Sequence, residues 1–182
     1  MMQELSIPGP KLINLKKLSD SRGWFSETFK SSWLKDFDID CNFVFEFWSF
    51  NEHRGTLRGL HSQNDKFVPA KLIMVLNGSI QDVILDARIN SPTFGQHCSL
   101  ILDSKNPQLL FVPKGFYHGF VTLEPNTFVG YKVDEYHAPH NECGVDYRDA
   151  NLNINWAITD NLIVSNRDLN NPSWDSCYKF NI

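Results

Sequence analysis

The sequence predicts an all-β fold, a β-barrel or jelly roll with few helices. Between residues 71 and 133, short apolar runs alternate with turn residues at intervals of about ten residues, which is typical of β-sandwiches and barrels. Of the 182 residues, 42% are hydrophobic and 13% are aromatic, enough for a substantial core. The chain has no repeat, low-complexity segment or linker, so residues 1–182 are predicted to form a single domain.

The expected strands follow one another along the middle of the chain. The run 72–76 leads into Asn77-Gly78, a dipeptide that favours a type I′ turn, and the run 80–85 follows, so we expect a β-hairpin there. Further strands are expected at 98–102, 109–112, 116–123 and 128–133, separated by turns at 91–95, 103–107, 113–115 and 124–126.

One short helix is expected near residues 28–37. Phe29, Trp33 and Phe37 recur at every fourth position there and therefore share one helical face. We interpret this aromatic stripe as core packing rather than as a ligand-binding surface. The chain from about residue 151 onward is polar and rich in turn residues, and we expect it to wrap around the barrel.

Charge and cysteine usage argue against several classes of function. Seventeen basic residues against 21 acidic ones give a net charge of −4, which disfavours a nucleic-acid partner but leaves room for a small phosphate-binding pocket. No apolar run approaches the roughly 20 residues of a membrane span, and the first residues lack the features of a signal peptide, so we expect no membrane partner. The widely spaced cysteines are predicted to be reduced thiols of a cytoplasmic protein: Cys41, Cys98, Cys143 and Cys177.

Two of the six histidines have surroundings that suggest chemistry. His61 and His118 are flanked by apolar residues at predicted strands, so both are expected to point into or across the barrel interior. Each could also be an ordinary core histidine that only satisfies its hydrogen bonds. The other four lie in polar or loop-like sequence, where a surface position is expected: His53, His97, His137 and His140.

A metal site and a proton-transfer site are the two chemistries that these histidines allow. The segment Pro113-Lys114-Gly115-Phe116-Tyr117-His118 resembles a motif of metal-binding cupins, but their second, His-x-His motif is matched here by His61-Ser62-Gln63. Only two imidazoles would then be available, and Lys71 on the next strand would repel a cation. We favour proton transfer, in which an imidazole acts as base, a carboxylate orients it, a phenol returns a proton and an ammonium group stabilises an oxyanion.

A series of short motifs between Ile7 and about Pro172 resembles the dTDP-4-dehydrorhamnose 3,5-epimerase family, which are cupin-fold sugar-nucleotide epimerases. Any one of these motifs is weak, but their correct order along the chain is specific. The motifs are Asp20-Ser21-Arg22-Gly23-Trp24-Phe25-Ser26-Glu27, Leu57-Arg58-Gly59-Leu60-His61, Ala70-Lys71-Leu72, Asp82-Val83 with Asp86-Ala87-Arg88, Ser91-Pro92-Thr93-Phe94-Gly95, Pro113 to Phe120, Tyr131-Lys132 and Ser165-Asn166-Arg167-Asp168.

The resemblance implies a reaction and a set of catalytic residues. Members of the family act on a nucleotide-linked 4-keto-6-deoxy sugar, whose C4 carbonyl acidifies the protons on C3 and C5, so no metal or redox cofactor is implied. By motif, His61 would be the base and Asp168 the carboxylate that orients it. Tyr131 would return a proton from the opposite face, Lys71 would stabilise the enolate oxygen, and His118 would line the sugar pocket.

The resemblance also implies a nucleotide-binding set and exposes one departure. Arg22 and Arg58 would hold the pyrophosphate, and Glu27 would lie on the nucleotide side. The family usually carries Gln-x-Asn-x-Ser before the Leu57-Arg58 motif. We assign Glu46 to the Gln, Trp48 to the Asn and Phe50 to the Ser, and expect this stretch to change the choice of substrate.

Several alternatives stay open at this stage. A sugar-nucleotide 3,4-ketoisomerase would use the same enolate chemistry but would move the carbonyl group. A metal-dependent cupin oxygenase would need a transition metal, and a sugar-binding module would have no use for the proton-transfer residues. Family members are homodimers, and the aromatic-rich stretch 43–48 would suit a dimer-forming sheet edge.

Overall fold

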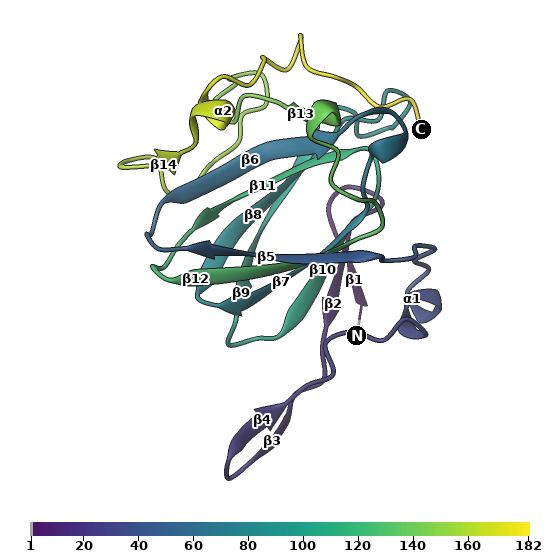
Figure 1. The fold of residues 1–182 in the computed structure, drawn as a ribbon, viewed down its shortest axis with the longest axis vertical. Helices are drawn as coiled ribbons and strands as arrows, with labels where there is room; N and C mark the ends of the chain where they lie inside the picture. The colour runs from purple at the N-terminus through teal and green to yellow at the C-terminus, as the bar shows by residue number, and fades with distance from the viewer. Residues whose placement is uncertain (1) are drawn as a thin grey trace.

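Two six-stranded sheets face each other in the computed structural model, which describes residues 2–182 (Figure 1). The first sheet has the order β1 (Met2–Glu4), β2 (Lys11–Asn14), β10 (Gln108–Val112), β7 (Lys71–Asn77), β12 (Thr127–Val133) and β5 (Phe45–Asn51). The second has the order β13 (Glu142–Gly144), β6 (Thr56–Gln63), β11 (Phe116–Thr122), β8 (Ser79–Asp86) and β9 (His97–Asp103), with β14 (Ile163–Val164) beside β6. The predicted all-β jelly roll is therefore confirmed.

The main core lies between the two sheets. Alternate residues of facing strands meet there, among them Ile73 and Val75 from β7 and Ile80 and Ile84 from β8. Burial of each such side chain stabilises the fold by roughly 1.5–3 kcal/mol. This apolar packing fixes the distance between the sheets and so holds open the space at their splayed end.

The C-terminal part of the chain covers the outer face of the second sheet, as the sequence predicted. Val145, Trp156 and Phe180 are buried in one cluster with Leu85 and Tyr117 of that sheet. Because side chains are covered on both faces, every residue of β8 is buried. The covering segment contains the one-turn helix α2 (Asn166–Leu169), which lies over β6 in Figure 1.

The hairpin predicted at Asn77-Gly78 is wrong. β7 pairs with β10 and β12, whereas β8 pairs with β9 and β11, so the two strands belong to different sheets. Gly78 has φ +79°, and an added Cβ there would overlap the hydroxyl group of Thr127. The Asn-Gly dipeptide thus supplies a tight, positive-φ turn, but the turn carries the chain from one sheet to the other.

The expected helix at 28–37 is reduced to the single turn α1 (Trp33–Asp36). Its buried residue is Leu34, while Phe29 and Phe37 pack beside it against the outer face of the first sheet. Trp33 stays partly exposed under the Lys30 ammonium group. The remaining helical turns are η1 (Asp65–Phe67) and η2 (Pro139–Asn141). Within residues 2–182, no helix is long and apolar enough to cross a membrane.

A two-stranded hairpin of β3 (Leu18–Asp20) and β4 (Gly23–Phe25) extends away from the sheets (Figure 1). Its apolar side chains contact little of the described chain: Trp24 is 49% exposed and Phe25 63% exposed. Arg22 at the tip forms an ion pair with Asp20 at 2.6 Å. The hairpin is therefore a projection with an unburied aromatic surface.

Candidate functional site

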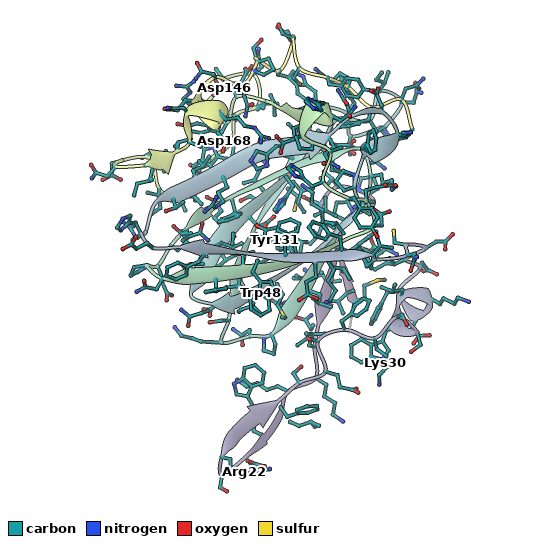
Figure 2. The ribbon with its side chains drawn as sticks, viewed as in Figure 1. Arg22, Lys30, Trp48, Tyr131, Asp146 and Asp168 are labelled. Carbon is teal, nitrogen blue, oxygen red and sulfur yellow. The ribbon has the colours of Figure 1, made fainter. Side chains whose placement is uncertain are left out.

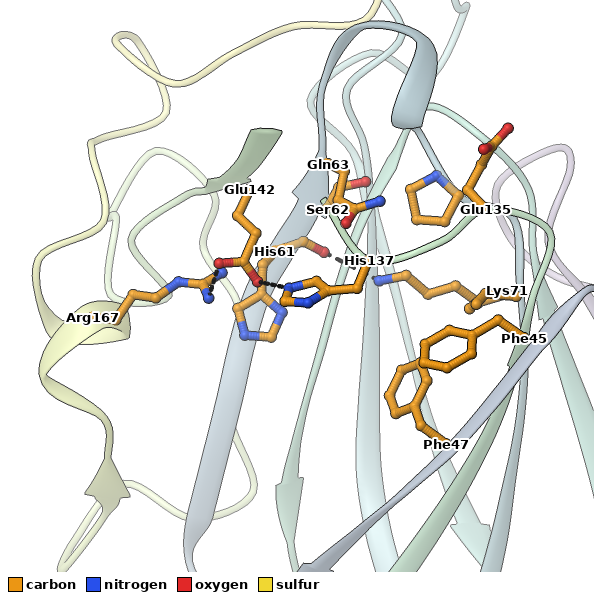
Figure 3. A pocket seen from close by; sticks show the side chains of 12 residues that line it. Phe45, Phe47, His61, Ser62, Gln63, Lys71, Glu135, His137, Glu142 and Arg167 are labelled. Carbon is orange, nitrogen blue, oxygen red and sulfur yellow. Dashed lines mark hydrogen bonds and ion pairs between the residues drawn. The ribbon is translucent and has the colours of Figure 1, made fainter. Parts of the chain in front are cut away.

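A cavity of about 380 Å³ opens between the two sheets, where β5 and β6 splay apart (Figure 3). Its walls combine an apolar side from the first sheet with a polar side from the second sheet and the neighbouring loops. The lining residues are Phe45, Phe47, His61, Ser62, Gln63, Pro69, Lys71, Val133, Glu135, His137, Glu142 and Arg167.

His61 and Asp168 form an imidazole–carboxylate pair at this cavity. The Nε2 atom of His61 lies 3.4 Å from Oδ1 of Asp168, whose side chain is only 5% exposed. Asp168 is fixed in turn, because its Oδ2 accepts the Gly59 N–H at 3.1 Å and its own N–H donates to the Ser165 hydroxyl at 3.1 Å. A carboxylate beside Nε2 favours the tautomer protonated there, which leaves Nδ1 as the basic nitrogen.

The surroundings tune both members of this pair. Burial lowers the pKa of His61 below its usual value, and the hydrogen bond and charge of Asp168 only partly oppose that effect. Burial acts to raise the pKa of Asp168, but hydrogen bonds from His61 and the Gly59 N–H outweigh it and hold that pKa below its usual value. At neutral pH, His61 is therefore an uncharged base beside a carboxylate anion.

Lys71 reaches across from the first sheet to the same place. Its Nζ donates to the backbone oxygen of His61 at 3.3 Å and its side chain lines the cavity. Burial lowers the pKa of Lys71 to about 8, partly countered by the charge of Asp82. An ammonium group with so few partners is suited to stabilising negative charge that develops on a bound molecule.

Tyr131 lies behind the apolar wall of the cavity. Its ring stacks on Phe47 with a centroid separation of 4.7 Å and is only 7% exposed. Burial and the charge of Asp82 raise the pKa of Tyr131 above its usual value, so the phenol holds its proton. Tyr131 belongs to β12 of the first sheet, where Figure 2 labels it, whereas His61 belongs to β6 of the second sheet.

His118 pairs in register with His61 on the second sheet, but it is deeper in the interior. It is 4% exposed, does not line the cavity, and its Nε2 lies 2.8 Å from Oδ2 of Asp82. Its ring meets that of Tyr131 edge-on at 6.3 Å. Asp82 is a residue that the sequence interpretation left without a role, and its Oδ1 is buried with no partner among residues 2–182.

Arg58 lies on β6, near the turn that joins β5 to β6. Its Nε donates to Oδ1 of Asn51 at 2.7 Å, and a second guanidinium nitrogen approaches the Phe50 backbone oxygen at 3.4 Å. The Arg58 charge also acts on Tyr131, where it lowers the phenol pKa slightly against the larger effect of burial. Arg58 is therefore close to Tyr131 and exposed to solvent, but it does not line the cavity.

Arg22 and Glu27 lie apart from this cavity within one chain. Arg22 is at the tip of the projecting hairpin, and its side chain is 88% exposed (Figure 2). Glu27 pairs with Lys30 at 2.8 Å on the chain that leads to α1. Neither lines the cavity.

Glu46 and Trp48, expected at the substrate, do not line the main cavity. Both point to the outer face of the first sheet, where they line a separate groove of about 160 Å³; Trp48 Nε1 donates to Glu46 Oε1 at 3.1 Å. Their neighbours Phe45 and Phe47 line the main cavity instead. Side chains alternate along a strand, so an error of one residue in the assignment exchanged the two faces.

Three linked polar residues of the cavity had no role in the sequence-based prediction, and Gln63, which was matched to the second His of the cupin metal motif, also lines it. His137, Glu142 and Arg167 are linked by ion pairs, and nothing in their spacing along the sequence indicates this contact. Gln63 is committed to the fold, because its amide bonds Phe67 O, Tyr136 O and the Ala138 N–H. No three His, Cys, Asp or Glu side chains gather as a metal centre would require anywhere in residues 2–182.

Comparison with known proteins agrees with this geometry. Residues 4–176 match the family described as dTDP-4-dehydrorhamnose 3,5-epimerase. The curated dTDP-4-dehydrorhamnose 3,5-epimerase of Sinorhizobium fredii is 37% identical over 171 residues, which cover 94% of this chain and 88% of that protein.

Two solved structures show the same fold. The dTDP-4-dehydrorhamnose 3,5-epimerase of Bacillus anthracis, with TDP and PPi bound, superposes with a TM-score of 0.91 at 40% identity and covers 95% of this chain and 99% of its own. ChmJ, a 3′-monoepimerase from Streptomyces bikiniensis in complex with dTDP-quinovose, gives 0.86 at 30% identity, over 93% of this chain and 85% of its own. From the motifs, the paired His61 and Asp168, and these matches, we conclude that the chain belongs to the dTDP-4-dehydrorhamnose 3,5-epimerase family.

Proposed function

We propose that this protein is a cofactor-independent epimerase of a nucleotide-linked 4-keto-6-deoxy sugar and inverts C3, C5 or both. The observation that carries this proposal is the His61–Asp168 pair, which opens on a cavity that also receives the ammonium group of Lys71. A neutral base next to a fixed cation is what removal of a proton beside a carbonyl group requires. The cavity volume of about 380 Å³ also suits a sugar-sized ligand.

The residues divide the reaction between the two sheets. His61 takes the proton from the carbon next to the carbonyl, and the C–H electron pair moves into an enolate whose oxygen Lys71 stabilises. Tyr131 then donates its proton to the same carbon from the first sheet, so the new C–H bond forms on the face opposite to His61. Delivery from the opposite face inverts the centre, and His118 with Asp82 supports the phenol from behind.

We propose that the nucleotide side of the substrate is held by Arg58 and completed by a second chain. Arg22 and Glu27, expected at the nucleotide, do not line the cavity of their own chain, and in this proposal they serve the cavity of a partner. The projecting hairpin and the edge strand β5 offer exposed aromatic side chains for a homodimer, notably Phe25 and Trp48. Light scattering at micromolar concentration tests this state, and a monomer would contradict it.

The aromatic wall is the reason to expect a change in substrate preference. Phe45 and Phe47 offer no hydrogen bond on the side of the cavity that faces His61, so a substrate meets an apolar surface there. We propose that this wall affects which nucleotide sugar is accepted and how many centres are inverted. Ordinary double inversion of dTDP-4-keto-6-deoxyglucose would show this part of the proposal to be wrong.

Proton NMR in D₂O tests the proposed function directly. The protein is incubated with dTDP-4-keto-6-deoxyglucose while the H3 and H5 signals are followed. Loss of both indicates a 3,5-epimerase, and loss of one indicates a single-centre enzyme. Loss of neither signal, from folded protein, would contradict action on this substrate, and a product with a displaced carbonyl would indicate a ketoisomerase.

The four unpaired cysteines fit our further proposal of a cytoplasmic, reducing location.

A further inference from the structure

A row of polar side chains leads from Arg58 to Tyr131, and the proposed reaction gives its middle members no role. Those members are Ser49 and Asn51, which alternate with Phe47 along β5 and therefore share the inner face of that strand. In the pairing of β5 with β12, Tyr131 lies opposite Phe47. Ser49, two residues further along β5, is therefore a diagonal neighbour of Tyr131.

The first link of this row fixes the orientation of the Asn51 amide, which is almost fully buried. Its Oδ1 accepts from Nε of Arg58 at 2.7 Å, and its Nδ2 donates to the Thr127 backbone oxygen at 3.1 Å. A guanidinium group can only donate and a carbonyl oxygen can only accept, so the opposite orientation of the amide would lose both bonds. The Nδ2 group of Asn51 is therefore the side that approaches Ser49, whose Oγ lies 3.5 Å away.

The second link leaves the hydroxyl hydrogen of Ser49 for Tyr131. Because Asn51 meets the Ser49 oxygen as a donor, the Ser49 O–H group can donate to its other partner, the phenol oxygen. Burial and the charge of Asp82 raise the pKa of Tyr131, whereas the hydrogen bond from Ser49 and the charge of Arg58 lower it. Since Tyr131 accepts from Ser49, its own O–H group remains available to a bound ligand.

We propose that Ser49 and Asn51 are positioning residues for Tyr131 and set the direction of its hydrogen bonding, so that the phenol donates toward the bound sugar. The inference rests on the proposed function, since it takes Tyr131 as the proton donor from it. The direction starts at Arg58, because a guanidinium group cannot accept a hydrogen bond. Arg58 donates to Asn51, and Asn51 donates to Ser49. Ser49 in turn donates to Tyr131.

The same contacts stabilise the phenol after it has reacted. An electron pair of the enolate forms the new C–H bond with the Tyr131 proton, and the pair of the broken O–H bond stays on the phenol oxygen. That oxygen is then an anion, and the hydrogen bond from Ser49 becomes stronger because its acceptor is charged. The tyrosinate takes its next proton from water and the His61 imidazolium returns one to water, so the protons balance over each turnover.

Separate measurements of proton exchange and of inversion test the proposal. In Ser49→Ala, which loses only the hydroxyl group of a half-buried side chain, kcat for inversion should fall about 10- to 100-fold, because a hydrogen bond to a charged oxygen is lost. KM should stay, since Ser49 acts on the acid and not on the substrate. Exchange of H3 or H5 in D₂O needs only the base, so the ratio of exchange to inversion should rise. Ser49→Thr, which keeps the hydroxyl group, should restore most of the turnover.

Asn51→Asp tests the direction of the hydrogen bonds. The carboxylate has nearly the volume of the amide and still accepts from Arg58, but it cannot donate, so the Ser49 hydrogen turns to the carboxylate. Turnover should fall at least as far as in Ser49→Ala, again with exchange retained.

The matched control is Ser99→Ala. Ser99 also lies on a strand and also accepts from a side-chain amide, Nε2 of Gln81 at 2.8 Å, but it belongs to β9 and lies outside the cavity. The control should leave exchange and inversion unchanged.

Four results would overturn the inference and leave the proposed function intact. They are an unchanged kcat in Ser49→Ala, an equal loss of exchange and inversion in that variant, a rise in its KM alone, and wild-type turnover in folded Asn51→Asp. Wild-type protein that exchanges neither H3 nor H5 would overturn the proposed function itself.

Discussion

Replacement of Asp168 by asparagine removes the charge of the carboxylate and the acceptor that fixes the tautomer of His61, so the charge alone sets the least effect to expect. The asparagine side chain would keep an oxygen for the Gly59 N–H and would occupy the same volume, so the one-turn helix α2 should persist. What disappears is the negative charge 3.4 Å from Nε2 of His61, together with the oxygen that accepts from Nε2–H. Because His61 becomes an imidazolium when it takes the substrate proton, loss of that charge destabilises the state that follows proton removal.

The size of the effect follows from the distance. Two unit charges 3.4 Å apart attract by about 5 kcal/mol at an effective dielectric constant near 20. The His61 side chain is 31% exposed, so we take about half of this energy after solvent screening, roughly 2–3 kcal/mol. In rate, that is a fall in kcat of about 30- to 150-fold.

Deuterium exchange at H3 and H5, measured by NMR, reports the proton-removal step without interference from product release. The control is Asp146→Asn, which removes another paired carboxylate of the C-terminal region, bound to Arg148 at 2.9 Å, away from the cavity. We expect the control to exchange at the wild-type rate. If Asp168→Asn kept more than a third of the wild-type exchange rate while folded, the charge argument would be refuted.

Three further outcomes are expected. His61→Ala should abolish both exchange and turnover, whereas Tyr131→Phe should abolish turnover but keep some exchange, because the enolate still forms and takes its proton back from the first face. The rate at limiting substrate should decrease on the acid side, at a pH below 6.5, because His61, whose pKa is lowered, becomes protonated there. It should also decrease above about pH 8, because Lys71 loses its charge. The Lys71→Met variant should not show this decrease at alkaline pH. Gly78→Ala should lower the free energy of unfolding in urea by about 2–4 kcal/mol, because φ is +79° and the new methyl group meets the Thr127 hydroxyl.

Each of these has a result that would contradict it. Equal loss of exchange in His61→Ala and Tyr131→Phe would remove the division between base and acid. A decrease in rate on the acid side that already begins above pH 7 would mean that burial is not the dominant effect on the pKa of His61. A Gly78→Ala protein as stable as wild type would show that the turn between the sheets relaxes freely.

Much of the fold could be predicted because strand positions depend on local patterns. The expected strands at 98–102, 109–112 and 128–133 each fall within the observed β9, β10 and β12. Pairing could not be predicted in the same way. Asn77-Gly78 has the local chemistry of a hairpin turn, but which strands β7 and β8 pair with depends on packing between distant segments, which no dipeptide encodes.

The candidate site also has a part that local sequence predicts and a part that depends on contacts between distant segments. His61, Lys71 and Asp168 could be singled out in the sequence because each is embedded in a specific motif, and in the structure they lie close together. Which side chains of β5 face the cavity could not be predicted, because this strand is aromatic on both faces and polar and apolar alternation gives no signal of which face is buried. Recognition of His137 required the contact with Glu142, which exists only once β13 has paired with β6.

The C-terminal segment that covers the second sheet also carries Asp168, and 109 residues separate that carboxylate from its backbone partner Gly59. The attachment of this segment and the basicity of His61 are therefore thermodynamically linked. If the segment detaches locally while the sheets stay folded, the base loses its carboxylate, and catalysis stops in a molecule that still has its β-structure. Heat inactivation should then precede the loss of the far-ultraviolet circular dichroism signal, and activity becomes a reporter of local opening rather than of global unfolding.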